Sequence, residues 1–190
     1  KGTITPVVVE GHLTHTYNWE NLTQSFSALP QVSYYYGLQM LSPTNGWAAG
    51  GIPGEKGVII HWDGSTWSLF KEFPGQSIHA LYMKSASEGW AGGFTGELYH
   101  YKNGTWTQVP SPTTKEIVDI GFDENGIGWA VGEDNALLQY INGQWTEFTD
   151  IRTDMLDYRA VDFTSGHGWL VGYNGIKSMG GLILENEDGL

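Results

Sequence analysis

The sequence predicts an all-β protein, a β-propeller of four-stranded antiparallel blades. Three observations predict it. The dipeptide Gly-Trp recurs four times at intervals of about forty residues, a second tryptophan recurs in the same register, and no helical apolar pattern separates the units. Four short strands in a unit of this length are typical of a propeller blade. We therefore expect about four blades in the 190 residues.

Composition and charge agree with this fold class and limit the function. The chain has 27 glycines and nine tryptophans, which favours short strands and tight turns. Nine Lys and Arg against 21 Asp and Glu give a net charge of −12, so we expect no nucleic-acid partner. Cysteine is absent, which excludes disulfides and thiol nucleophiles. No apolar run approaches the ~20 residues that cross a bilayer, so we expect no membrane insertion.

The innermost strand of each unit is predicted by apolar residues that alternate with period two, as one face of a strand requires. These pairs are Leu38 and Met40, Leu81 and Met83, Ile120 and Phe122, and Val161 and Phe163. The second strand starts at the Gly-Trp dipeptide, and its small residues allow neighbouring sheets to approach closely. The third strand ends in an Asp-Gly or Asn-Gly turn, which suits a tight hairpin. The fourth strand starts at the second tryptophan, with an apolar residue three places later: Phe70, Val109 or Phe148.

The repeated tryptophans are interpreted as packing residues wedged between blades, because a ligand site seldom needs the same residue in every unit. They are Trp19, Trp47, Trp67, Trp90, Trp106, Trp129, Trp145 and Trp169.

The repeat divides the chain into one propeller domain with five parts. These are an N-terminal segment with a closing strand at Trp19 (1–33), three blades (34–77, 78–116 and 117–156) and an incomplete blade (157–190).

Two alternatives remain for the ends. The Trp19 strand completes the last blade and closes a four-bladed ring, or the chain is part of a larger propeller, with residues 3–10 as a strand of an earlier blade. We prefer a ring completed by other sequence or by another chain.

The units resemble the repeats of bacterial propellers in the sialidase-like, Asp-box (BNR-like) superfamily. The resemblance rests on segments such as Gly89-Trp90-Ala91-Gly92-Gly93 with Asn103-Gly104-Thr105-Trp106, and is strongest to photosystem II assembly-factor-like proteins. It implies the propeller fold, whereas function varies among hydrolases, lectins and assembly scaffolds. The Asp-box pattern is met loosely by Asp63-Gly64-Ser65-Thr66-Trp67, and later units carry Asn103 or Asn142 instead. We interpret these residues as ordering their turns.

We predict no enzyme, no catalytic residue, no metal site and no cofactor. The resemblance to sialidases would imply three arginines at the substrate carboxylate, and the chain has only Arg152 and Arg159. Asp119 and Asp162 on inner strands are the one carboxylate pair that could meet near the axis, as a glycosidase would need. The matching positions in other units are glycine and alanine, which disfavours this pair. The six histidines are scattered over the units.

The candidate binding site lies where the inner strands begin. The position two before the first core residue is Tyr36, His79, Val118 and Arg159 in successive units, and it does not repeat as structural positions do. We predict a polar and aromatic rim that binds a partner, formed by Tyr35, Tyr36, His79, Arg159 and Tyr173.

The function we expect is that of a non-enzymatic interaction or assembly module for a protein partner, with self-association as a further possibility. The alternative is a carbohydrate-binding lectin in which Trp62, Tyr101 and Tyr140 stack on sugars, and a glycoside hydrolase is a third hypothesis. Low lysine content and two Asn-x-Thr triplets, at Asn21 and Asn103, favour an extracellular or cell-surface location.

Overall fold

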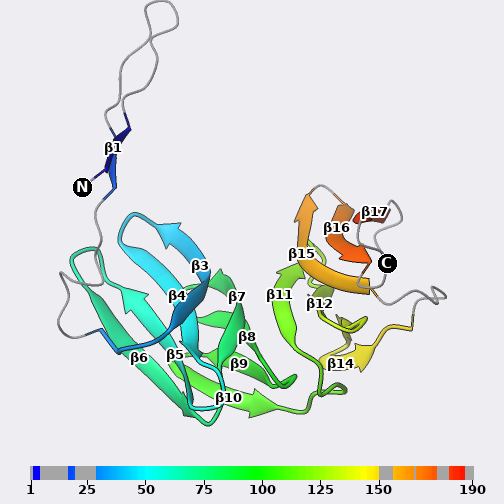
Figure 1. Ribbon diagram of the computed structural model, residues 1–190, viewed down its shortest axis with the longest axis horizontal. Coiled ribbons are helices and arrows are strands. Elements are labelled where there is room, and N and C mark those ends of the chain that lie inside the picture. Colours follow the sequence, from blue (N-terminus) through cyan, green and yellow to red (C-terminus); the bar gives the residue numbers. More distant parts are fainter. Residues whose placement is uncertain are drawn as a thin grey trace, which may run out of the picture.

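The computed structural model describes residues 2–4, 17–19, 29–149, 156–164, 166–174 and 180–186. Within these residues the regular elements are strands, and no helix there has the length and hydrophobicity that crossing a bilayer would require. Four antiparallel sheets follow one another along an open arc (Figure 1). The protein is therefore a β-propeller arrangement of successive blades, as the repeat predicted.

Each blade is a meander whose strands pair in chain order. The first blade contains β3 (Tyr34–Ser42), β4 (Asn45–Ile52), β5 (Lys56–Trp62) and β6 (Trp67–Pro74). The second contains β7 (Ile78–Ser85), β8 (Glu88–Gly93), β9 (Leu98–Lys102) and β10 (Thr105–Val109). The third contains β11 (Ile117–Phe122), β12 (Gly128–Gly132), β13 (Leu137–Ile141) and β14 (Gln144–Glu147). The fourth contains β15 (Leu156–Thr164), β16 (His167–Asn174) and β17 (Gly181–Asn186).

The hairpin turns between the third and fourth strands are stabilised in two different ways. Asn103 and Gly104 have φ of 48° and 91°, which is the positive-φ pair of a tight hairpin that follows the strand twist. In the first blade the Asp63 carboxylate instead accepts hydrogen bonds from the backbone N–H of Ser65 and Thr66, both at 2.8 Å. These bonds hold the pKa of Asp63 below its usual value. Both residues thus order a turn.

Neighbouring blades pack face to face through apolar residues. The first tryptophan of a blade points toward the following blade: buried Trp47 shares a core cluster with Leu81 and Met83, and Trp90 shares the next with Ile120 and Trp145. The inner strands β3, β7, β11 and β15 lie side by side in that order. Burying a tryptophan removes ~200 Å² from water, an upper bound of ~5 kcal/mol each.

The two ends of the arc expose residues whose counterparts are buried. Leu38 on β3 is 68% exposed, whereas Leu81, its counterpart on β7, is 8% exposed. Ile183 on β17 is 75% exposed, whereas Ile59, its counterpart on β5, is 0% exposed. We call the first surface, with Leu38 and Met40, the leading face, and the second, with Val171 and Ile183, the trailing face. Each is half of a blade interface.

The N-terminal strand does not complete the last blade in this structure. Trp19 lies in β2 (Tyr17–Trp19), which pairs with β1 (Gly2–Ile4), and Trp19 is opposite Gly2. In the described residues the last sheet has the order β15-β16-β17. Because β2 pairs with β1 here, the described residues do not show the Trp19 strand in the last blade, and closure of a four-bladed ring by this strand stays a prediction. Completion by other sequence or another chain stays a prediction.

Candidate binding rim

The four candidate positions are β-bulges. In each inner strand the pairing register with the second strand shifts across one residue, and that residue is Tyr36, His79, Val118 or Arg159. A bulge places an extra residue outside the ladder and redirects its side chain. The same bulge in every blade therefore sets four non-repeating side chains at the same level of the inner strands.

The residue before each bulge fixes the strand in the core. Ile78, Ile117 and Tyr158 occupy this position in the second, third and fourth blades, and all three are buried. Tyr35 takes this position in the first blade, where it is half-buried and its hydroxyl has no hydrogen-bond partner among the described residues. Burial raises the pKa of Tyr35, so the phenol stays neutral. The residues before the bulges are all buried or half-buried, whereas the bulged residues differ in chemistry.

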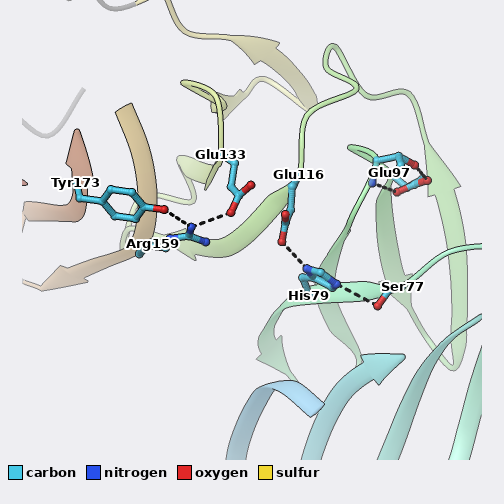
Figure 2. A network of polar contacts seen from close by, with 8 residues as sticks. Ser77, His79, Glu97, Glu116, Glu133, Arg159 and Tyr173 are labelled. Carbon is cyan, nitrogen blue, oxygen red and sulfur yellow. Dashed lines mark hydrogen bonds and ion pairs between the residues drawn. The ribbon is translucent and has the colours of Figure 1, made fainter. Parts of the chain in front are cut away.

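His79 organises one half of the rim. Its Nδ1 lies 2.5 Å from Oε1 of Glu116, and its Nε2 lies 3.0 Å from Oγ of Ser77, as Figure 2 shows. The ring of Tyr36 packs on the imidazole with centroids 3.9 Å apart, and Phe94 lies on it at 5.5 Å. Burial, followed by the nearby Tyr34 and Glu116, raises the pKa of Tyr36. The structure thus brings Tyr36 and His79 together, with Tyr36 outermost.

Ser77, His79 and Glu116 have the hydrogen-bonding order of a catalytic triad, but this arrangement does not expose a nucleophile. Ser77 is 0% exposed, so no substrate carbonyl can reach its hydroxyl in this conformation. The order Ser–His–Glu instead satisfies three buried or half-buried polar groups and fixes the imidazole under Tyr36.

Arg159 organises the other half. Its Nη2 donates hydrogen bonds to Oε1 of Glu133 and to the hydroxyl of Tyr173, both at 2.7 Å (Figure 2). The guanidinium also lies 5.2 Å from the centre of the Tyr173 ring. The hydrogen bond that Arg159 donates to Tyr173, together with the one that it donates to Glu133, raises the pKa of Arg159. Arg159 and Tyr173 therefore form one contact surface held by a carboxylate.

Glu116 and Glu133 were missed as individual site residues. Glu116 lies immediately before the inner strand β11, and Glu133 lies immediately after the second strand β12. Their partners come from a different blade, so chain spacing alone does not reveal the pairs. Each carboxylate contacts one bulged residue of a neighbouring blade, Glu116 contacting His79 and Glu133 contacting Arg159.

The proposed sugar-stacking residues have different environments. Tyr101 is 4% exposed and packs between Trp47 and Trp106, with centroids 5.1 Å from each, so it offers no free ring face to a sugar. Tyr140 is half-buried against Trp90 and Trp145. Trp62 is half-buried and donates its indole N–H to the carbonyl of Pro43, 3.0 Å away.

The repeat tryptophans that the structure describes also differ in burial. Trp47, Trp90, Trp106 and Trp145 are buried, and Trp67, Trp129 and Trp169 are half-buried. The side chain of Trp19 lies outside the described residues.

The carboxylates of Asp119 and Asp162 accept hydrogen bonds from backbone N–H groups. The Asp119 oxygens accept hydrogen bonds from the N–H of Ile120 at 2.9 Å and of Val161 at 2.8 Å. Asp162 accepts one from Phe163 at 2.9 Å. Burial raises the pKa of Asp119 to about 6, opposed by the two hydrogen bonds and aided by the charge of Asp162. Among the described residues no three His, Cys, Asp or Glu side chains gather as metal ligands.

No family model and no curated protein matches the sequence. Among solved structures, the chain is similar to the computationally designed Ika4 protein, with a TM-score of 0.61 and 18% identity over 85% of this chain and 96% of that one. It is also similar to a puromycin-hydrolyzing peptidase of Mycobacterium tuberculosis, with a TM-score of 0.58 and 7% identity over 83% of this chain and 28% of that one.

A structure of YCF48 bound to D1 peptide also matches, with a TM-score of 0.44 and 16% identity over 85% of this chain and 68% of that one. The matches to the Ika4 protein and to the peptidase, at 18% and 7% identity, show the propeller fold alone. The chain spans 49% of the designed Ika8 protein and about a quarter of the peptidase.

Proposed function

We propose that the chain is a non-enzymatic protein-binding module that contacts a polypeptide partner through its rim of bulged residues. The observation that carries the proposal is that one bulge recurs in four blades, while the residue that it presents changes from Tyr36 to His79, Val118 and Arg159. A bulge kept for packing alone would not require four different side chains.

The chemistry of the rim indicates the kind of partner. Tyr36 and Tyr173 are 44% and 40% exposed, and exposed aromatic rings with few rotatable bonds are common anchors at protein interfaces. Glu133 pairs with Arg159, the Glu116 carboxylate lies against His79, and the whole chain carries a charge of −12. We therefore propose a partner segment with basic side chains, whose affinity falls as salt concentration rises.

The test uses peptides selected against the intact chain from a random displayed library. We expect the selected peptides to be rich in Lys and Arg. The double variant Tyr36→Ala with Arg159→Ala should weaken a selected peptide at least about tenfold, with little change in melting temperature because both side chains are exposed. Ile141→Ser, at an exposed site at the end of β13, is the matched control. Unchanged affinity of the double variant would refute the rim as the site.

A further inference from the structure

A groove of about 400 Å³ lies between the second and third blades, away from the rim. Trp90, His100 and Val109 line it from the second blade, and Tyr140 and Trp145 line it from the third. The groove lies within the size range of small-ligand sites, and half of its lining residues carry aromatic rings. The rim does not account for it, because none of these residues contacts His79 or Arg159 in the networks described above.

The neighbouring interfaces have a phenylalanine where this groove opens. Phe70, three residues after the second tryptophan of its blade, packs edge-on against Trp47 with ring centroids 4.8 Å apart. Phe148 packs the same way against Trp129, at 5.0 Å. The corresponding residue of the second blade is Val109, which has no ring. At this position of the fourth strand, the ring is thus present at the other two blade interfaces and absent at the interface between the second and third blades.

Two ring contacts of the tryptophan are shared by the first two interfaces. His61 lies 4.3 Å from Trp47, and His100 lies 4.1 Å from Trp90. The tyrosine of the following blade lies 5.1 Å from Trp47 and 4.9 Å from Trp90. The histidine and the tyrosine that flank the Phe70 ring are therefore reproduced around Trp90, where Phe122 of the third blade is a further ring, 6.1 Å from Trp90 and 5.6 Å from Tyr140.

We propose that the groove binds an aromatic side chain, phenylalanine or tyrosine, of a partner polypeptide. The incoming ring takes the place beside Trp90 that Phe70 takes beside Trp47. This inference rests on the proposed class of partner, a polypeptide, but on residues separate from the rim. An aromatic anchor in a preformed pocket is a common source of specificity at protein interfaces.

The walls also carry unused hydrogen-bonding capacity. In the described part of the chain, Nε1 of Trp145 and Nε2 of His100 are buried without a hydrogen-bond partner, and the nearest carboxylate oxygen to His100 Nε2, on Glu88, is 3.6 Å away. A small opening of the groove would let a phenol or carbonyl oxygen reach them. Tyrosine should therefore bind at least as well as phenylalanine.

The groove between the first and second blades is a poorer site for a ring. Its surface is mostly polar, although Phe73, Tyr99 and Trp106 also line it. The polar side chains there are Lys71, Glu72, Gln76 and Gln108. Desolvating these groups would oppose entry of an aromatic ring.

The experiment titrates the intact chain with N-acetyl-phenylalanine amide and N-acetyl-tyrosine amide, and follows the indole N–H signals of Trp90 and Trp145 by NMR. N-acetyl-glycine amide is the control probe. We expect both aromatic probes to shift these signals saturably and the glycine probe to leave them in place. Equal shifts with the glycine probe would overturn the proposal.

Two reciprocal variants locate the site. Val109→Phe supplies the missing ring from the chain itself and should weaken the aromatic probes at least about tenfold. Phe70→Val removes the ring from the first interface and should create a second site, seen as new shifts at the Trp47 signal. If Val109→Phe folds, unchanged probe affinity would overturn the proposal. If Val109→Phe does not fold, the absence of a new site in Phe70→Val would overturn it. The rim double variant Tyr36→Ala with Arg159→Ala should bind the probes normally, so loss of the rim and loss of the groove are told apart.

Discussion

The carboxylate of Asp119 on β11 accepts a hydrogen bond of 2.8 Å from the backbone N–H of Val161 on β15. This bond joins the inner strands of the third and fourth blades. Gln39 performs a similar task between the first two blades, where its side chain bonds both the N–H and the carbonyl of Met83, at 2.6 and 2.9 Å. The inner strands are thus joined by polar side chains as well as by apolar packing.

Asp119 should make stability depend on pH. Its pKa of about 6 in the folded chain is above the unfolded value of about 3.9. Between these values the folded chain keeps a proton that the unfolded chain releases, so the free energy of unfolding falls as pH rises through this window. The contribution is up to about 3 kcal/mol and is fully present below pH 4. Urea unfolding of the wild type and Asp119→Asn from pH 4 to 7 should give profiles that diverge by this amount, whereas parallel profiles would contradict it.

Replacing the equivalent residues Leu81 and Leu38 by alanine should lower the free energy of unfolding by different amounts. Leu81→Ala should cost about 2 to 4 kcal/mol, because the side chain is buried between the first two blades. Leu38→Ala, on the leading face, should cost less than about 1 kcal/mol because it creates no cavity. The measurement is chemical unfolding of both variants at the same protein concentration. Equal costs would mean that the leading face is covered in solution.

Tyr101 should behave as a core residue. We expect Tyr101→Ala to lower the free energy of unfolding by about 3 kcal/mol, because the ring fills space between two blades. Tyr173→Ala, at a tyrosine that is 40% exposed, is the matched control and should cost much less. Thermal unfolding followed by tryptophan fluorescence compares the two. A Tyr101→Ala variant as stable as the control would contradict the packing role.

The Asn-Gly turn of the second blade should prefer Gly over Ala. Asn103 has φ of 48°, a conformation that costs a residue with a Cβ about 1 kcal/mol unless its side chain compensates. Asn103→Ala should therefore lower stability by about that amount, and Asn103→Gly should be close to neutral. Urea midpoints of both variants provide the test, and an alanine variant at the wild-type midpoint would show that this turn is not strained.

The repeat predicted the fold well because each marker reports a local requirement. Alternating Leu38 and Met40 imply one apolar strand face, and Asn103-Gly104 implies positive φ, whatever the rest of the chain does. Neither feature depends on the other blades. The sequence could not show which half of an interface stays uncovered, because Leu38 and Leu81 have the same local pattern and differ only in what lies against them.

The rim was only partly predictable. The irregular series Tyr36, His79, Val118 and Arg159 was visible in the register of the repeat, but the bulge that presents them was not. Glu116 and Glu133 pair across blades, and such pairs depend on loop paths that the sequence does not specify. The role of the rim in binding and the extracellular or cell-surface location remain predictions.

The open arc gives the molecule a direction. Its leading and trailing faces are different surfaces, with Leu38 at one end and Ile183 at the other, so one copy cannot cover both with a two-fold contact. A contact that joins the leading face of one copy to the trailing face of the next would present the same two faces again at its ends. Such growth stops only when the accumulated rotation returns to the start, and otherwise continues as a filament.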